Sequence, residues 1–378
     1  MDFETLRTQL LDFRASSRES IQINFELGRQ ERSQVHDMAK ELGLFSSSHN
    51  HPQSTIKYII VSKFKESDDD NIKIDDKLIN TFVSWASVPI PVQLPEYLDY
   101  YLYLTDKYYN SKKLFALFME DVKRFGGINK FIAHMNDVTD NIIRNIKSQP
   151  QYKTLLDAKF SKNISQSQED KGNFYKMNNS GKWFISVDIK SANFTTLHMN
   201  YPGLFDGSST WLEYLSKETT SEFIIASKFI REVIFGKLGT SNRVSALCVA
   251  FISEIIDKIK GTVFYKYLDI ANRSHDEVIF SFKSDDDSSE QIFDLLKNFL
   301  LESWPDKLHI KMFKLVNLSD KPYFVKEYPD GTIEFKKCPG KFIMQCIRFF
   351  QKEPCQELDL KFVDEGYVAT YDRSIFNE

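Results

Sequence analysis

Residues 183–194 read WFISVDIKSANF, and residues 273–282 read RSHDEVIFSF. In each stretch, a run of β-branched and aromatic residues about as long as one strand has a carboxylate at one end. Asp188 follows the first run, whereas Asp276 and Glu277 precede the second. If the two strands are neighbours in one sheet, Asp188 and Asp276 lie side by side at its edge.

Two carboxylates held side by side repel each other unless cations lie between them. Two Mg²⁺ (or Mn²⁺) ions about 3.5–4 Å apart would relieve this repulsion. The sequence therefore predicts Asp188 and Asp276 as metal ligands and as catalytic residues. Glu277 is predicted to be catalytic in a supporting role beside Asp276. It is not predicted as a metal ligand, because successive residues of a strand point to opposite faces.

The sequence around these stretches predicts an α+β fold with an antiparallel sheet in its C-terminal part. Alternating and β-branched runs indicate strands, and residues 329–331 read PDG, a turn between two of them. The predicted strands are Trp183–Val187, Tyr265–Ile270, Val278–Phe282, His309–Val316, Tyr323–Glu327 and Thr332–Lys336; a helix is predicted at Glu290–Leu301, and a strand or helix at Phe342–Phe350.

Between the two carboxylate stretches, residues 227–243 read SKFIREVIFGKLGTSNR and predict a helix that carries basic side chains. Lys228 and Arg231 stand on this helix at three-residue spacing, and Gly236 follows an aromatic residue.

These motifs together resemble the palm of right-hand nucleic-acid polymerases. VDIKSANF is similar to motif A of reverse transcriptases, SHDEVIF to motif C of the bacterial DNA polymerase I family, and the helix between them to motif B of that family. The resemblance implies that Asp188 and Asp276 hold Mg²⁺, and that Lys228 and Arg231 bind a nucleoside triphosphate. It implies a set of substrate-binding residues made up of Lys228, Arg231, Gly236 and Arg243. A reverse-transcriptase-like alternative makes Gly236–Arg243 a loop that supports the template, and both alternatives stay open.

Two further interpretations compete with a polymerase. No YxDD sequence is present, and a palm can lose its activity and remain as a scaffold. The chain would then be a catalytically inactive nucleic-acid-binding subunit of a replication or transcription complex. Alternatively, it is an interaction scaffold without any nucleic-acid role.

The N-terminal residues predict strand, helix and strand, and resemble the Arg-x-x-x-His family of single-stranded nucleic-acid-binding domains. Within ERSQVHDMAKELGLFSSS, Arg32 and His36 stand four apart and so share one face of a helix. The strand IKYIIVSK ends at Lys63. The resemblance implies that Arg32, His36 and Lys63 contact a single strand.

The middle of the chain carries local positive charge: between residues 107 and 162 there are eleven Lys or Arg and five Asp or Glu. Lys112 and Lys113 alternate there with aromatic residues, a composition that suits phosphates and bases. Those aromatic residues also lie at helical spacing, which equally favours a core. Lys112 and Lys113 are predicted to contact nucleic acid.

Composition breaks divide the chain into residues 1–65, residues 66–180, which read as a linker and helical region, and residues 181–378. The resemblances imply that residues 1–65 are a single-strand-binding domain and residues 181–378 a palm-like domain. The net charge of −4 excludes a uniformly basic surface. The four cysteines do not pair as C-x-x-C, and no run of about 18 apolar residues occurs. We expect a cytoplasmic or nuclear protein without a membrane contact, whose partners are single-stranded or template-primer nucleic acid, nucleoside triphosphates and other replication or transcription proteins.

Overall fold

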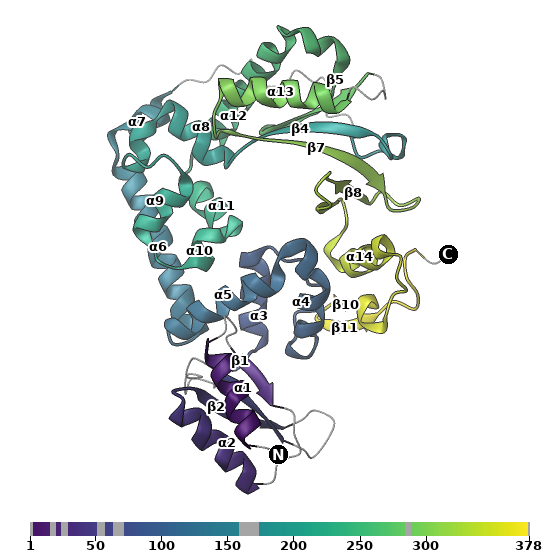
Figure 1. Cartoon of the computed structure of the whole chain (residues 1–378). Coiled ribbons are helices and arrows are strands. Elements are labelled where there is room, and N and C mark those ends of the chain that lie inside the picture. The colour runs from purple at the N-terminus through teal and green to yellow at the C-terminus, as the bar shows by residue number, and fades with distance from the viewer. Residues whose placement is uncertain are drawn as a thin grey trace. The chain divides into compact units, whose positions relative to one another are not determined.

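The computed structural model forms two compact units, Met1–Lys73 and Ile74–Glu378, and confirms the α+β class (Figure 1). Each unit is described by itself. The predicted boundary near residue 180 falls inside the second unit. The structure describes residues 3–15, 20–23, 29–50, 57–62, 72–158, 174–283 and 289–376.

The first unit is a three-stranded antiparallel sheet with two helices, α1 (Phe3–Ala15) and α2 (Arg29–Glu41). Its strands lie in the order β1 (Ser20–Ile23), β3 (Lys57–Ser62) and β2 (Phe45–Asn50). Apolar residues of both helices and the sheet form one buried cluster.

Helix α2 ends at Glu41, and Gly43 just beyond it adopts a φ of +69°, which glycine tolerates without strain. The amide of Gly43 donates to the carbonyl of Lys40, and the amide of Leu44 donates to that of Ala39. These hydrogen bonds satisfy carbonyls that the helix end would otherwise leave unpaired.

The second unit begins with a bundle of helices around an aromatic core. The helices are α3 (Asp76–Ala86), α4 (Pro95–Tyr109), α5 (Ser111–Arg124), α6 (Ile128–Ser148) and α7 (Pro150–Asp157). Phe82, Trp85, Phe118 and Phe131 are buried and pack ring against ring. Phe118, one of the aromatic residues among the lysines, therefore belongs to the core and is not available to bases.

A six-stranded antiparallel sheet forms the other half of the second unit. Its strands lie in the order β5 (Leu268–Arg273), β6 (Glu277–Phe282), β4 (Trp183–Ile189), β7 (Leu308–Asn317), β8 (Phe324–Glu327) and β9 (Ile333–Lys336). Helices α8 (Ala192–Asn200), α12 (Ser241–Lys260) and α13 (Ser289–Ser303) cover one face (Figure 1). The hairpin partner of β6 begins three residues later than predicted, because Val263–Tyr267 forms a 3₁₀ turn.

The helices between β4 and β6 join the sheet to the helical bundle. They are α8, η3 (Pro202–Phe205), α9 (Trp211–Glu218), α10 (Glu222–Ala226), α11 (Lys228–Lys237) and α12. Helix α11 packs on α3 and α6, and α10 packs on α5. The insertion between the two carboxylate strands is therefore held by the bundle.

After the sheet, the chain returns to the bundle. Helix α14 (Ile343–Gln351) packs on α4, followed by η6 (Glu357–Leu360) and a hairpin of β10 (Lys361–Asp364) with β11 (Tyr367–Thr370). Phe342–Phe350, predicted as strand or helix, is helical from Ile343. Across the described residues, none of the helices is both long enough and apolar enough to span a bilayer.

Candidate active site

The pairing of β4 with β6 brings the predicted catalytic carboxylates together. Asp188 stands directly opposite Glu277, and the amide of Ile189 donates to the carbonyl of Asp276 at 2.9 Å. Residues directly opposite each other in an antiparallel pair project to the same face. Asp188 and Glu277 thus share one face of the sheet, and Asp276 stands at the turn just before β6. Helices α8, α12 and α13 cover the sheet from one side (Figure 1).

The environment of Asp188 strongly disfavours its negative charge. Burial, followed by the nearby charges of Asp276 and Glu277, raises the pKa of Asp188 to about 7, although Lys326 and Lys228 oppose the shift. Three carboxylates therefore lie close enough to act on one another. A divalent cation bound among them would remove this electrostatic penalty.

Glu277 is already neutralised by the protein itself. Its Oε1 accepts a hydrogen bond from Ser186 Oγ at 2.6 Å and from Lys326 Nζ at 3.1 Å. Lys326 comes from β8, is almost fully buried, and places its ammonium 4.4 Å from the ring centroid of Phe313. The hydrogen bond between Glu277 of β6 and Ser186 of β4 therefore joins the two strands through their side chains.

Sequence reasoning missed Ser186 and Lys326. Both stand at positions of their strands that face the same side as Asp188. Ser186 is the one polar residue in the apolar run WFISV, and a single polar residue at an inward position of a strand indicates a buried partner. Lys326 gives no such signal, because Glu327 follows it in YFVKE.

Replacing Lys326 by Ala is expected to destabilise the second unit by about 2–4 kcal/mol, because Glu277 would lose its cationic partner beside other carboxylates and keep only the hydrogen bond from Ser186. Chemical denaturation at neutral pH measures the change. Lys336→Ala is a matched control, since Lys336 pairs with Glu334 at 2.7 Å in a more exposed place on β9. A loss no larger than in this control would contradict the pairing.

The basic residues of α11 approach the same site from the bundle side. Lys228 lowers the pKa of Asp188 and forms an exposed ion pair with Glu232, at 3.6 Å between Nζ and Oε1. Arg231 donates to the hydroxyl of Ser191, three residues after Asp188, at 3.3 Å. The N-cap Ser227 donates to the carbonyl of Trp85 at 2.7 Å and so anchors the start of α11 to α3.

The other two predicted substrate-binding residues are Gly236 and Arg243. Gly236 is an exposed helical position, and a Cβ added there would meet no atom within 4 Å. Arg243, in the first turn of α12, donates to the carbonyl of Leu156 in α7. The structure therefore brings Lys228 and Arg231, but not Arg243, toward Asp188.

In the first unit, the pair on α2 forms a separate polar site. His36 places Nδ1 2.7 Å from Ser46 Oγ and Nε2 2.9 Å from Ser48 Oγ. The pKa of His36 is lowered, chiefly by burial. The charge of Asp37 opposes this shift and the charge of Arg32 adds to it, so Arg32 is near the imidazole. Lys63 lies outside the described residues.

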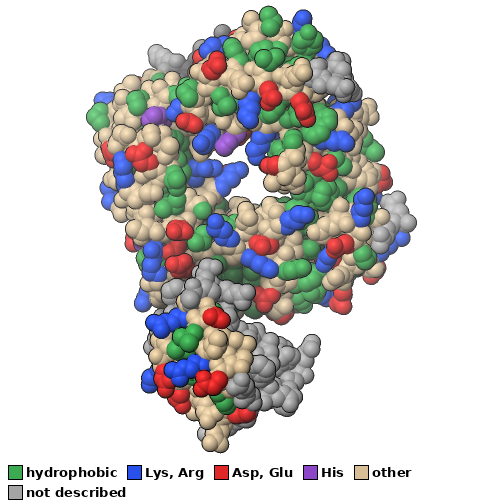
Figure 2. All heavy atoms as spheres, in the orientation of Figure 1, with side chains coloured by type: hydrophobic (Ala, Val, Ile, Leu, Met, Phe, Trp, Pro, Cys, Tyr) green, Lys and Arg blue, Asp and Glu red, His purple; other side chains and the backbone are tan. Residues whose placement is uncertain are grey.

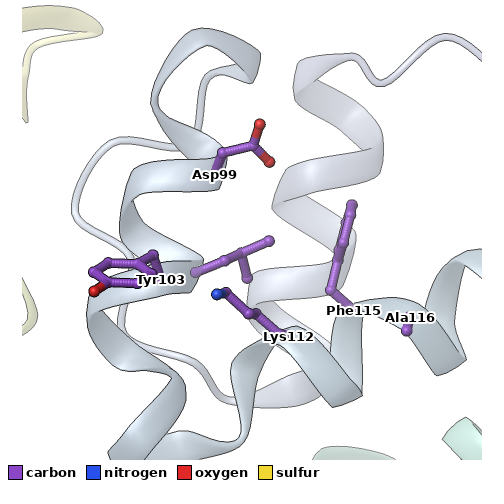
Figure 3. Close-up of a pocket in the computed structure, with 6 residues that line it drawn as sticks. Asp99, Tyr103, Lys112, Phe115 and Ala116 are labelled. Atoms are coloured by element: carbon purple, nitrogen blue, oxygen red, sulfur yellow. The ribbon is translucent and has the colours of Figure 1, made fainter. Parts of the chain in front are cut away.

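Lys112 borders a shallow pocket of about 480 Å³ between α4 and α5 (Figure 3). Its ammonium lies 4.7 Å from the ring centroid of Tyr103. Asp99, Leu102, Phe115 and Ala116 complete the lining. Lys113, the next residue on α5, is exposed. The pocket contains none of the carboxylates around Asp188.

The side chains around Asp188 determine which residues could hold a metal ion. Within the part of the chain that the structure describes, three or more His, Cys, Asp or Glu side chains do not gather in a metal-binding arrangement. The residues that fit a hard cation are Asp188 and Asp276, whose oxygens are the ligands that Mg²⁺ prefers. Glu277 is occupied by Ser186 and Lys326.

Comparison of the chain with protein-family models, with curated proteins and with solved structures found no match.

Proposed function

We propose that the chain is a nucleic-acid polymerase, a template-directed nucleotidyltransferase that works with Mg²⁺ or Mn²⁺ held by Asp188 and Asp276. The observation that supports this most is the burial of Asp188 beside Asp276 and Glu277, which raises the pKa of Asp188 to about 7. Acids with strongly perturbed pKa values concentrate at functional sites, because burial and like charges cost stability elsewhere.

The neighbouring residues suit phosphoryl transfer. Divalent cations bound there would activate a 3′-hydroxyl and stabilise the charge on a leaving pyrophosphate. Lys228 and Arg231 stand on the helix that faces Asp188 and would bind the triphosphate of the incoming nucleotide. Lys326 holds Glu277, which keeps the two carboxylate strands in register.

In this proposal the partners are template-primer or single-stranded nucleic acid, nucleoside triphosphates and other replication or transcription proteins. Arg32 and His36 of the first unit would hold single-stranded template or product. The positive charge around Lys112 and Lys113 would contact phosphates.

Primer extension with Mg²⁺ tests the proposal, with DNA and RNA templates and with deoxy- and ribonucleoside triphosphates. The full chain is expected to extend a primer, and the double variant Asp188→Ala/Asp276→Ala is expected to fall to background. If the two proteins are equally inert on every template, the catalytic part of the proposal is lost.

The second candidate is a catalytically inactive, palm-like nucleic-acid-binding subunit. It is favoured by the neutralisation of Glu277, which leaves two free carboxylates at the site instead of three. Single-strand affinity measured against salt concentration tests it, because each phosphate contact releases counterions and steepens the fall of affinity with salt. A flat dependence would remove nucleic acid from both candidates and leave an interaction scaffold.

A further inference from the structure

The second unit surrounds an opening. Figure 2 shows a hole through it, with Lys and Arg side chains gathered around the rim. The sheet, α14, the bundle helices α3–α5 and the helices α10 and α11 follow one another around this hole (Figure 1). The contacts of α14 with α4, of α10 with α5, and of α11 with α3 show that these elements touch.

The ring is closed by a contact between α4 and the residues that follow the sheet, which we call the closing contact. Asp359 is completely buried, and its carboxylate accepts from Arg348 Nε at 3.1 Å and from the hydroxyl of Tyr100 at 2.7 Å. The hydroxyl of Tyr101 donates to the carbonyl of Leu358 at 2.9 Å. Residues 100 and 359 are joined covalently through the bundle and the sheet, so this contact completes the circuit of the chain.

The closing contact continues along α4. The hydroxyl of Tyr108 accepts from Gln351 Nε2 at 3.1 Å, and its ring packs edge-on against Phe335 with the centroids 5.3 Å apart. Arg348 also donates to the hydroxyl of Tyr100 at 3.1 Å. The contact therefore joins polar and aromatic groups over most of the helix.

The sheet face that borders the opening presents basic side chains beside the carboxylates. His309 stands opposite Asp188 and Lys311 opposite Ser186 in the β4–β7 pair, which places both on that face. Burial lowers the pKa of His309, and the nearby charges of Lys190 and Lys311 lower it further. From the bundle side, Lys228 and Arg231 face the same place. A polyanion complements such a lining.

We propose that a nucleic-acid strand passes through the opening, and that the closing contact makes the second unit a closed ring around it. This inference rests on the proposed function only in taking nucleic acid as the ligand. A linear strand can enter a closed ring by one of its ends. A circular strand has no ends, so it can enter only when the closing contact opens. A strand held in this way cannot leave sideways, whatever the strength of its phosphate contacts.

The experiment compares a covalently closed single-stranded DNA circle with an open linear strand of the same length and sequence. The full chain is loaded at low salt and then challenged in roughly 0.5 M NaCl, which strips phosphate-mediated binding. On the circle, the expected half-life is roughly tenfold or more longer than on the linear strand, where the ring slides off an end. Binding to the linear strand with no binding to the circle is the result expected if the ring stays shut.

The double variant Tyr100→Phe/Tyr101→Phe removes the hydroxyls of the closing contact and keeps the rings, so that the fold is retained. Its retention on the circle is expected to fall toward that on the linear strand, with low-salt affinity for the linear strand unchanged. Tyr103→Phe, an exposed tyrosine of the same helix, is the matched control and should behave as the unaltered chain.

Equal binding and equal half-lives on circle and linear strand would overturn the ring proposal. If primer extension is observed at the same time, the proposed function stands and only the ring is lost. If neither strand binds at any salt concentration, both are lost.

Discussion

A chain carrying Asp188→Asn is expected to lose primer extension by roughly 10³-fold, because an amide cannot supply the charge that holds a divalent cation and balances the transferred phosphate. The substitution keeps the shape of the side chain, so the strand pairing with β6 should survive. Single-turnover extension under saturating nucleotide measures the loss. Extension at the unaltered rate would show that Asp188 does not take part in the chemistry.

The same variant is expected to be more stable than the unaltered chain at alkaline pH without metal. The pKa of Asp188 is about 7 in the folded state and 3.8 ordinarily, so ionisation is harder in the folded chain. The stability penalty is absent below about pH 4, grows as the pH rises toward about 7, and is complete above that. Allowing for partial exposure, we expect Asp188→Asn to gain about 2 kcal/mol at pH 8.

Thermal unfolding at pH 5 and pH 8 measures this gain. Mg²⁺ should raise the Tm of the unaltered chain at pH 8 and leave that of Asp188→Asn unchanged, since binding to the folded state alone stabilises it. Asp269→Asn is the matched control, because Asp269 is an exposed carboxylate of the same sheet. The stability gain of Asp188→Asn over the unaltered chain should be larger at pH 8 than at pH 5. An equal gain at both pH values would show that the folded chain does not disfavour the charge of Asp188.

Replacing Arg348 by Ala is expected to destabilise the second unit by about 3–5 kcal/mol, because Asp359 would be left as a buried charge without its cation. The carboxylate of Asp359 is completely buried and the guanidinium of Arg348 nearly so. Urea unfolding at neutral pH measures the loss.

Lys361→Ala is the control for this experiment. Lys361 pairs with Glu357 at 3.0 Å in the same segment, but the carboxylate there is 78% exposed. Exposed pairs contribute about 1 kcal/mol or less. A loss for Arg348→Ala as small as that for Lys361→Ala would mean that Asp359 is not held as the structure shows.

Much of the sheet could be predicted from the sequence because local residue patterns decide where strands form. The β-branched runs at β4, β6 and β7 and the turn at Pro329–Gly331 mark their own strands. Strand β2 was not predicted, because its serines hide the alternation that a half-buried strand normally shows. The 3₁₀ turn at Val263–Tyr267 was also missed, since its aromatic residues equally suit a strand.

The carboxylates of the candidate site and the basic residues Lys228 and Arg231 could be suggested by the sequence. Asp188 and Glu277 each stand at one end of two neighbouring strands, and Asp276 stands at the turn just before the second. Lys326 reaches Glu277 because β8 follows β7 on the far side of β4, and strand order in a sheet depends on packing that no local pattern encodes. The contact of Arg243 with the carbonyl of Leu156 could not be predicted for the same reason, since it depends on where α7 packs.

The hydroxyl of Tyr100 donates to Asp359, which stands 259 positions further along the chain. During synthesis, α4 leaves the ribosome long before Arg348 and Asp359 are added to the chain. Until then, the tyrosines of α4 are exposed to water or to chaperones. Contacts between such distant positions slow folding, because the chain entropy of a long loop is lost before the contact forms. Completion of the second unit is therefore a late event of biogenesis, and a polypeptide interrupted before residue 348 would expose an aromatic helix surface prone to aggregation.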